Sequence, residues 1–254
     1  MCQNEVMQRT RGRAPTGGRA GALSQEVIVG AAVSLLDELG ERGFTFRLLA
    51  KELNTGPGAL YWHVSNKDEL VALAADQVLG HAFAAHPSLE EGAASGLRAL
   101  AVAVFDALDR HPWAASHVSA PPTLANALRL LDRIGTLVAR TGLPAERHFA
   151  VSTAISYYIT GVSAQIIAPP LTHDATVGRD DFLARTAQRW EELDPVDYPF
   201  LTSTTQHLRD HTDRDQFVAG LDMLLDGLNA TAAQPGEGER PAGGPSDSGR
   251  PGRG

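Results

Sequence analysis

Apolar residues recur at intervals of three and four along most of the chain, the spacing that gathers them on one face of an α-helix. No segment shows a sustained alternation of apolar and polar residues, so no β-strand is predicted. The predicted helices span residues 24–43, 45–53, 57–63, 66–85, 89–110, 113–119, 123–141, 145–168, 179–193 and 214–230. The fold class that we expect is therefore all-α.

Local signals place the ends of the first helices. Ser24 and Thr45 are suited to cap the first two helices, because their hydroxyls accept the free backbone N–H groups of a first turn. Asn54 follows the second helix, where a turn needs a residue that tolerates the left-handed conformation. Pro57 suits the first turn of the third helix.

Composition excludes several classes of protein. The chain has 254 residues and a net charge of −8, which disfavours a broadly basic surface but not a local one. Its one cysteine, Cys2, can form no intrachain disulfide and no multi-thiolate zinc site. No apolar segment follows the N-terminal Arg residues, as a signal peptide would require. The uncharged stretch 149–172 is interrupted by Ser, Thr and Gln, which is typical of a buried helix rather than a bilayer span. We expect a cytoplasmic protein with no membrane partner.

The sequence also contains no catalytic motif. We find no nucleophile elbow, no Gly-rich phosphate loop and no His-Glu metal helix. We therefore expect a protein that is not an enzyme and that uses no cofactor and no metal ion.

The most informative segment is 45–67, TFRLLAKELNTGPGALYWHVSNK. It predicts two short helices joined by a tight turn, with the small residue Ala50 where the two helices approach closely. This arrangement is typical of a helix-turn-helix, whose second helix enters the major groove of DNA. From the pattern alone, an ordinary helical hairpin is an equally good interpretation.

The side chains of this segment favour a DNA-binding role. Leu60 faces inward, which leaves Tyr61 and His63 pointing outward near Arg47 and Lys67. A cation such as Lys67 is unfavourable at the N-terminus of a helix, and a bound phosphate would resolve the conflict. For the neighbouring Trp62, packing against adjacent helices is the alternative interpretation.

Residues 24–79 resemble the N-terminal domain of the tetracycline repressor (TetR) family of bacterial transcription regulators. The resemblance depends on the capped first helix, on TFRLLAKEL and above all on LYWHVSNKDEL. It implies that Arg47 contacts a base or a phosphate, that Tyr61 and His63 contact the phosphate backbone, and that Lys67 contacts a phosphate. The full set of DNA-binding residues that we predict is Thr45, Arg47, Pro57, Gly58, Tyr61, Trp62, His63 and Lys67.

The chain departs from the family at the variable specificity positions. Residues 56–59 read Gly-Pro-Gly-Ala and offer no Gln, Asn or Arg to pair with a base edge. Gly58 would let the helix approach DNA closely. Direct base reading therefore depends on Arg47, supplemented by DNA shape and thymine methyl contacts.

Residues 95–230 are similar to the C-terminal ligand-binding and dimerisation domain of the tetracycline repressor type. The similarity depends on HPWAASHVSAPPTLANALRLL and FVAGLDMLLDGL. It implies that helices 145–168 and 214–230 form a four-helix bundle with a partner subunit, in which we expect Leu221 and Leu225. A monomeric helical core is the alternative.

The same similarity implies a small-molecule effector. We expect a small, largely apolar ligand in a cavity within residues 83–168, and the candidate lining residues are Phe83, Phe105, Trp113, His117 and Tyr158. His117 matches a position that ligates drug-bound magnesium in the tetracycline repressor, although a capping or structural role is an alternative. Phe83 and Pro121 stand where the family's drug site has other residues, so we expect no magnesium–tetracycline site.

The predicted organisation has four parts. A disordered Arg/Gly-rich arm (1–22) precedes a helix-turn-helix domain (23–70), a helical ligand-binding and dimerisation domain (71–231) and a disordered tail (232–254). A long helix joins the two folded domains. The arm has two interpretations, a minor-groove contact and a solvated end.

The predicted function is a ligand-responsive homodimeric repressor that binds a palindromic operator and is released by a small molecule. The alternatives are an activator, a structural DNA-binding protein without a ligand, and an enzyme that carries a helix-turn-helix.

Overall fold

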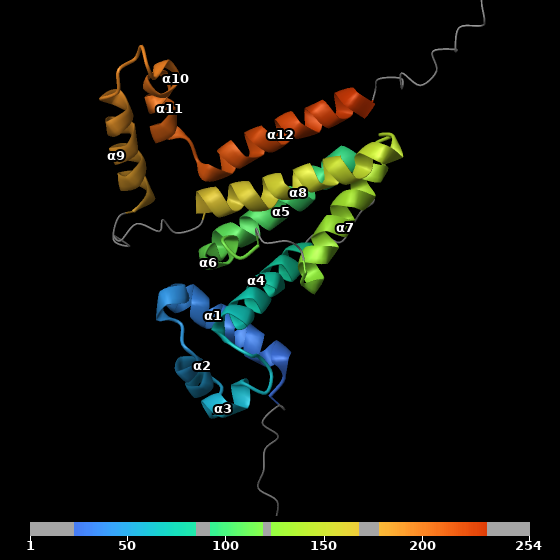
Figure 1. Cartoon of the computed structure of the whole chain (residues 1–254), viewed down its shortest axis with the longest axis vertical. Coiled ribbons are helices and arrows are strands. Elements are labelled where there is room, and N and C mark those ends of the chain that lie inside the picture. The colour runs from blue at the N-terminus through green and yellow to red at the C-terminus, as the bar shows by residue number, and fades with distance from the viewer. Residues whose placement is uncertain (1–22, 85–91, 119–122, 168–177, 233–254) are drawn as a thin grey trace, which may run out of the picture.

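The computed structural model describes residues 23–84, 92–118, 123–167 and 178–232, and within these ranges every regular element is a helix (Figure 1). The helices are α1 (Gln25–Gly43), α2 (Phe46–Glu52), α3 (Pro57–Leu60), α4 (Lys67–Ala84), α5 (Ala93–Arg110), α6 (Pro112–Ala115), α7 (Ala125–Ala139), α8 (Ala145–Ile167), α9 (Arg179–Glu191), α10 (Pro199–Ser203), α11 (Thr205–Asp210) and α12 (Asp213–Ala232). The all-α prediction is confirmed. None of these helices is long and apolar enough to cross a bilayer.

Several predicted segments lie outside the described residues. They are the arm 1–22, the tail 232–254 apart from Ala232, Pro121, and the predicted helix ends at 85, 89–91, 119 and 168.

The predicted capping residues hold the first helices in place. The Ser24 hydroxyl accepts the Val27 N–H at 3.2 Å, and the Thr45 hydroxyl accepts the Leu48 N–H at 3.3 Å. Asn54 has a φ of 51°, the left-handed conformation expected at the turn after α2. The N-terminal helices then close around a shared core that includes Ile28, Leu36, Phe44, Leu49 and Leu60.

Three predicted features are wrong in detail. The helix predicted over 113–119 is α6, which ends at Ala115 because the Ala114 carbonyl accepts the His117 N–H and closes it in a turn. Helix α3 ends at Leu60 instead of His63, because the Leu60 carbonyl accepts the N–H groups of both His63 and Val64 and closes the helix in a turn. Helices α10 and α11 were not predicted, because neither has a periodic apolar stripe. Helix α10 buries no side chain, and α11 buries only Thr205.

Helix α4 connects the two halves of the molecule (Figure 1). Its first turn is capped by Asn66, whose side chain accepts the Glu69 N–H at 2.8 Å. The Ser65 N–H donates to the Glu69 carboxylate at 2.7 Å, and this bond lowers the pKa of Glu69. Farther along, α4 packs against α1, α5, α6 and α7.

A buried carboxylate joins α4 to α7. Asp76 is 8% exposed and accepts the backbone N–H groups of Asn126 and Ala127 at 3.0 and 2.9 Å. These donors belong to the first turn of α7, where unpaired N–H groups and the helix dipole both favour a negative charge. Gly80, one turn farther along α4, lies against the Asn126 side chain, so the two helices meet closely here.

The C-terminal half is built on α5 and α8, which pack against each other and against both α7 and α12 (Figure 1). The rings of Phe105 and Phe217 stack with their centroids 4.4 Å apart. The Tyr158 hydroxyl donates to the Phe217 carbonyl at 2.8 Å, and burial raises the pKa of this hydroxyl. Arg98–Asp222 and Arg214–Asp106 ion pairs link α5 to α12 at 2.7 and 2.9 Å.

The close approach of α8 and α12 depends on Gly220, because a Cβ there would overlap the Tyr158 hydroxyl. We predict that Gly220→Ala lowers the free energy of unfolding by about 1–3 kcal/mol, the usual cost of overpacking. Urea unfolding measures the change. Gly30→Ala, in the interior of α1 with the Gln77 side-chain nitrogen 4.0 Å from its Cβ, is the control and should leave stability unchanged or raise it. Equal effects of the two substitutions would contradict the packing argument.

Candidate nucleic-acid interface

Helices α2 and α3 form a helix-turn-helix. Ala50 is buried between them, and its carbonyl accepts the Thr55 N–H at 2.8 Å across the turn. Leu49 and Leu60 bury the inner faces of the two helices against α1 and the start of α4. A small residue was predicted at this crossing, and the structure confirms it.

The outer face of this unit carries most of the predicted DNA-binding residues. Thr45, Arg47, Pro57, Gly58 and Tyr61 are exposed, and Gly58 has open space where a Cβ would lie. The face therefore presents its polar and aromatic groups to solvent above a packed core.

Trp62 is the most exposed large apolar residue of this face, at 88%. The alternative interpretation, in which Trp62 packs against neighbouring helices, is therefore wrong. Tyr61 lies against Phe46 with ring centroids 5.0 Å apart, which orients its phenol. His63 is half-buried, and its carbonyl accepts the Gln25 side-chain amide at 3.3 Å.

Lys67 has protein partners that the sequence did not reveal. Its ammonium donates to the carbonyls of Glu41 and Phe44 at 2.6 and 3.0 Å. These carbonyls lie at the C-terminal end of α1, where free carbonyls and the helix dipole attract a cation. The unfavourable position of Lys67 at the start of α4 is therefore compensated within the protein, and no phosphate is needed for that purpose.

The five candidate effector residues fall into three groups. Phe105 and Tyr158 both contact Phe217. Phe83 lies under the Arg133 guanidinium, whose central carbon is 5.1 Å from the centroid of the Phe83 ring. Trp113 and His117 instead bind carboxylates of α1. These contacts do not bring the five side chains together.

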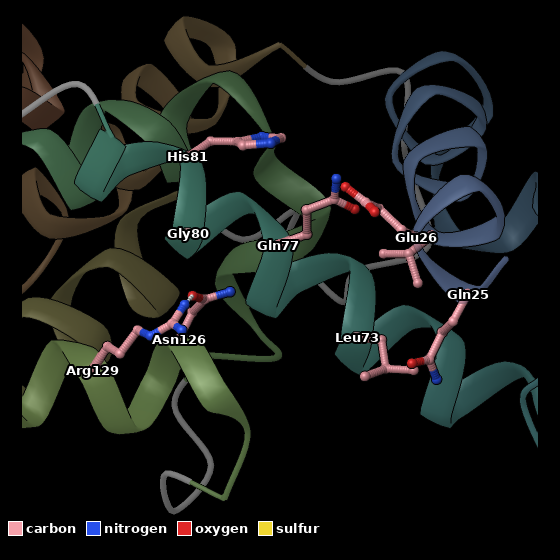
Figure 2. A pocket seen from close by; sticks show the side chains of 9 residues that line it. Gln25, Glu26, Leu73, Gln77, Gly80, His81, Asn126 and Arg129 are labelled. Atoms are coloured by element: carbon pink, nitrogen blue, oxygen red, sulfur yellow. Dashed lines mark hydrogen bonds between the residues drawn. The ribbon is translucent and has the colours of Figure 1, made fainter.

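The groove in Figure 2 lies elsewhere, between α1, α4 and α7, and has a volume of about 400 Å³. Its lining residues are Gln25, Glu26, Val29, Leu73, Gln77, Gly80, His81, Asn126 and Arg129. None of the five candidate effector residues lines this groove. Its lining is largely polar, unlike the apolar cavity that the sequence predicted.

Two structural features escaped sequence reasoning. Ser163 is fully buried on α8, and its hydroxyl has no hydrogen-bond partner in the described part of the chain. Ser163 follows Ile155 and Ile159 at intervals of one helical turn, and this spacing could have indicated from the sequence that it is buried. Asp37 and Glu41 of α1, which bind residues of the C-terminal half, gave no signal because an exposed acidic helix face is usually only solvated.

The described residues contain no cluster of three or more His, Cys, Asp or Glu side chains that could hold a metal ion.

Comparisons with known proteins agree with this geometry. Residues 28–74 match the family model "Bacterial regulatory proteins, tetR family", and residues 86–232 match "Tetracyclin repressor-like, C-terminal domain". The transcriptional regulator SCO7222, a TetR from Streptomyces coelicolor, is 40% identical, with a TM-score of 0.68 over 83% of this chain and 99% of that one.

Two further proteins add detail. The HTH-type transcriptional repressor DrrR1 of Streptomyces coeruleorubidus is 28% identical over 88% of this chain and 83% of its own length. The structure of ActR from Streptomyces coelicolor in complex with actinorhodin is 25% identical, with a TM-score of 0.67 over 84% of this chain and all of that one.

The contacts of Lys67 generate a prediction about stability. Lys67→Met removes the ammonium but keeps the apolar stem, and should lower the free energy of unfolding by about 1–3 kcal/mol without DNA. Thermal or urea unfolding measures this loss. Lys51→Met, at an exposed position on α2, should change stability by about 0.5 kcal/mol or less. If Lys67 acts only on a phosphate, Lys67→Met would keep full stability and only weaken the salt dependence of DNA binding.

Proposed function

We propose that this chain, which belongs to the TetR family of bacterial transcription regulators, is a homodimeric repressor that binds a palindromic operator and releases it when a small molecule binds. The exposed face of α2 and α3 carries this proposal. Trp62, Tyr61 and Arg47 are exposed on this helix-turn-helix, so they contribute nothing to its core and are available to bind DNA. The similarity to a protein named as a repressor supports the sign of the regulation.

On DNA, the two ends of this face have different roles. Arg47 reads a base edge or a phosphate from α2, and Tyr61, Trp62 and His63 contact the sugar–phosphate backbone at the end of α3. Thr45, Pro57 and Gly58 lie close to the major groove of the DNA. Because Gly58 has no side chain, the α3 backbone can approach the bases there. Lys67 has two of its three N–H groups bound to carbonyls, so one remains for a phosphate.

The dimer would form through the outer faces of α8 and α12. On α8 the exposed residues from Phe149 through Tyr157 to Gln165 carry no charge, and on α12 Met223 is 76% exposed. Such uncharged, apolar exposure marks a surface that is covered by a partner. One helix-turn-helix reads only a few base pairs, and a two-fold dimer doubles the site.

The dimer residues expected from the sequence require a correction. Leu221 and Leu225 are 0% and 4% exposed within a single chain, where they fill the core beside α5 and α8. They cannot face a partner subunit. Met223 points to the other side of α12 and takes their place in the proposal.

The effector would bind within the C-terminal half. The inner face of α5 is apolar, whereas α8 buries Ser152, Thr160 and Ser163 beside Ile155 and Ile159. The Ser152 and Thr160 hydroxyls donate to backbone carbonyls of α8, and the Ser163 hydroxyl has no hydrogen-bond partner among the described residues. A largely apolar ligand with one hydrogen-bonding group suits such a lining. Support for a small-molecule effector comes from the complex of ActR with actinorhodin.

Release would follow from a change in the spacing of the two DNA-binding faces. Helix α4 packs against both halves, so a ligand that favours one tilt of α4 would shift α2 and α3. In a dimer the two α3 helices must match successive major grooves, about 34–36 Å apart, so a small shift is enough to lose affinity.

Arg47 provides the first test of DNA reading. On an operator selected by the wild-type protein from random DNA, Arg47→Ala should cost about 1–3 kcal/mol and relax the base preference. Arg47→Lys is the matched variant, because it keeps the charge but loses the planar fork of donors. It should retain the salt dependence and lose the preference. Unchanged selectivity of both variants would show that Arg47 reads no base.

Met223 provides a test of assembly. Met223→Glu should shift sedimentation from dimer to monomer at micromolar concentration and abolish operator binding, because a buried unpaired charge costs several kcal/mol, on the order of 3–5. Asn229→Glu, exposed about a third of a turn round the same helix, is the control and should remain dimeric. A wild-type protein that sediments as a monomer would refute the dimer.

A further inference from the structure

Two carboxylates at the end of α1 bind the α6 region of the C-terminal half. The Trp113 indole N–H donates to the Asp37 carboxylate at 2.7 Å, and His111 Nδ1 lies 2.8 Å from the same oxygen. Beyond Gly40, whose φ of 65° interrupts the helical backbone of α1, the Glu41 carboxylate lies 2.9 Å from His117 Nε2. Residues separated by 74 to 76 positions in the sequence thus meet at three points.

The contact of Trp113 with Asp37 has a physical cause. Trp113 is 5% exposed, and a buried indole N–H that finds no acceptor costs a desolvation penalty. Asp37 supplies this acceptor from the other domain. The contact therefore differs from an exposed ion pair, which contributes little to orientation.

The same end of α1 leads directly to the DNA-binding helices. The Glu41 and Phe44 carbonyls bind Lys67, and the Phe44 side chain is fully buried. Thr45, the next residue, caps α2. Asp37 and Glu41 therefore lie at the end of α1 that leads, through Phe44 and Thr45, into the first turn of α2.

Helix α6 is well placed to respond to events in the C-terminal half. It packs against α4, α5 and α8, and α8 carries the unpartnered Ser163 hydroxyl. A displacement of α6 would act on Asp37 directly through Trp113 and His111, in addition to its effect on α4.

We infer that Asp37 is a coupling residue: it ties α1, and through α1 the helices α2 and α3, to α6, so that the state of the C-terminal half reaches the DNA-binding helices through this direct contact as well as along α4. The inference depends on the proposed function for its biological purpose. The coupling itself exists without operator or effector, and its test uses neither.

The test is hydrogen exchange of the full-length free protein, followed by mass spectrometry. Asp37→Ala removes the acceptor, and Trp113→Phe removes only the donor while keeping a buried aromatic ring. Peptides from residues 45–64 should exchange at least about tenfold faster in both variants, the effect expected from losing one charge-assisted hydrogen bond. The double variant should exchange within about threefold of Asp37→Ala, because both changes break the same bond.

Two controls make the result specific. Glu38→Gln changes the neighbouring exposed carboxylate of α1 and should leave exchange in residues 45–64 within about twofold of wild type. Asp76→Asn weakens the link between α4 and α7 and should accelerate exchange in α7 but not in residues 45–64. Peptides from α8 and α12 in the same digests report global stability.

Three outcomes would overturn the inference. The first is unchanged exchange in residues 45–64 of both Asp37→Ala and Trp113→Phe. The second is an acceleration that peptides from α8 and α12 share equally, which would indicate a global loss of stability. The third is an acceleration in residues 45–64 caused by Asp76→Asn and not by Asp37→Ala, which would place the route along α4. Because no DNA or ligand is present, each outcome leaves the proposed repressor function to be judged by its own tests.

Discussion

A single helix, α4, contributes buried side chains to both halves of the molecule, from Leu70 beside the DNA-binding helices to Phe83 against α7. A helix that is buried by two bodies at once cannot move relative to one of them without disturbing its packing against the other. The Asp76 carboxylate fixes α4 to α7, because it accepts the Asn126 and Ala127 N–H groups of the first turn of α7. These N–H groups have no partner within their own helix. The rest of the architecture depends on this shared burial.

The two ends of α4 connect to the rest of the chain by different chemistry. At the N-terminal end, Lys67 binds the last carbonyls of α1, so the start of α4 and the end of α1 are held together. Asp37 and Glu41, in the last turns of α1, then reach the C-terminal half through polar contacts that require correct alignment. The DNA-binding helices are therefore attached to the C-terminal half at two places, by apolar packing along α4 and by directional hydrogen bonds at α1.

The local features of the DNA-binding half could be predicted because they depend on neighbours in the sequence. The caps at Ser24 and Thr45, the left-handed Asn54 and the small residue at Ala50 are each set within one or two turns. The family resemblance added expected roles for exposed side chains such as Tyr61, which no periodicity could assign. The partners of Lys67 escaped prediction because they are backbone carbonyls some 23 to 26 residues away, which leave no mark on residue type.

The C-terminal half was less predictable for a different reason. Helix α12 carries apolar residues on more than one side, so periodicity alone could not tell Leu221, which faces its own core, from Met223, which faces solvent. The effector residues were chosen from the resemblance and from the apolar composition of the middle helices, neither of which indicated that Trp113 and His117 bind carboxylates of α1. Long-range polar contacts of this kind depend on how whole helices pack, and the sequence pattern of one helix does not contain that information.

The central claim is that the exposed face of α2 and α3 reads DNA as one half of a symmetric pair. Footprinting of the wild-type protein on the DNA upstream of its own gene tests this claim most directly. The account predicts two protected half-sites related by a two-fold axis, with centres about one helical turn or a small multiple of it apart. Both half-sites should lose protection together when Arg47 is replaced by Ala. A single unpaired protected site, or protection that ignores sequence, would contradict the account.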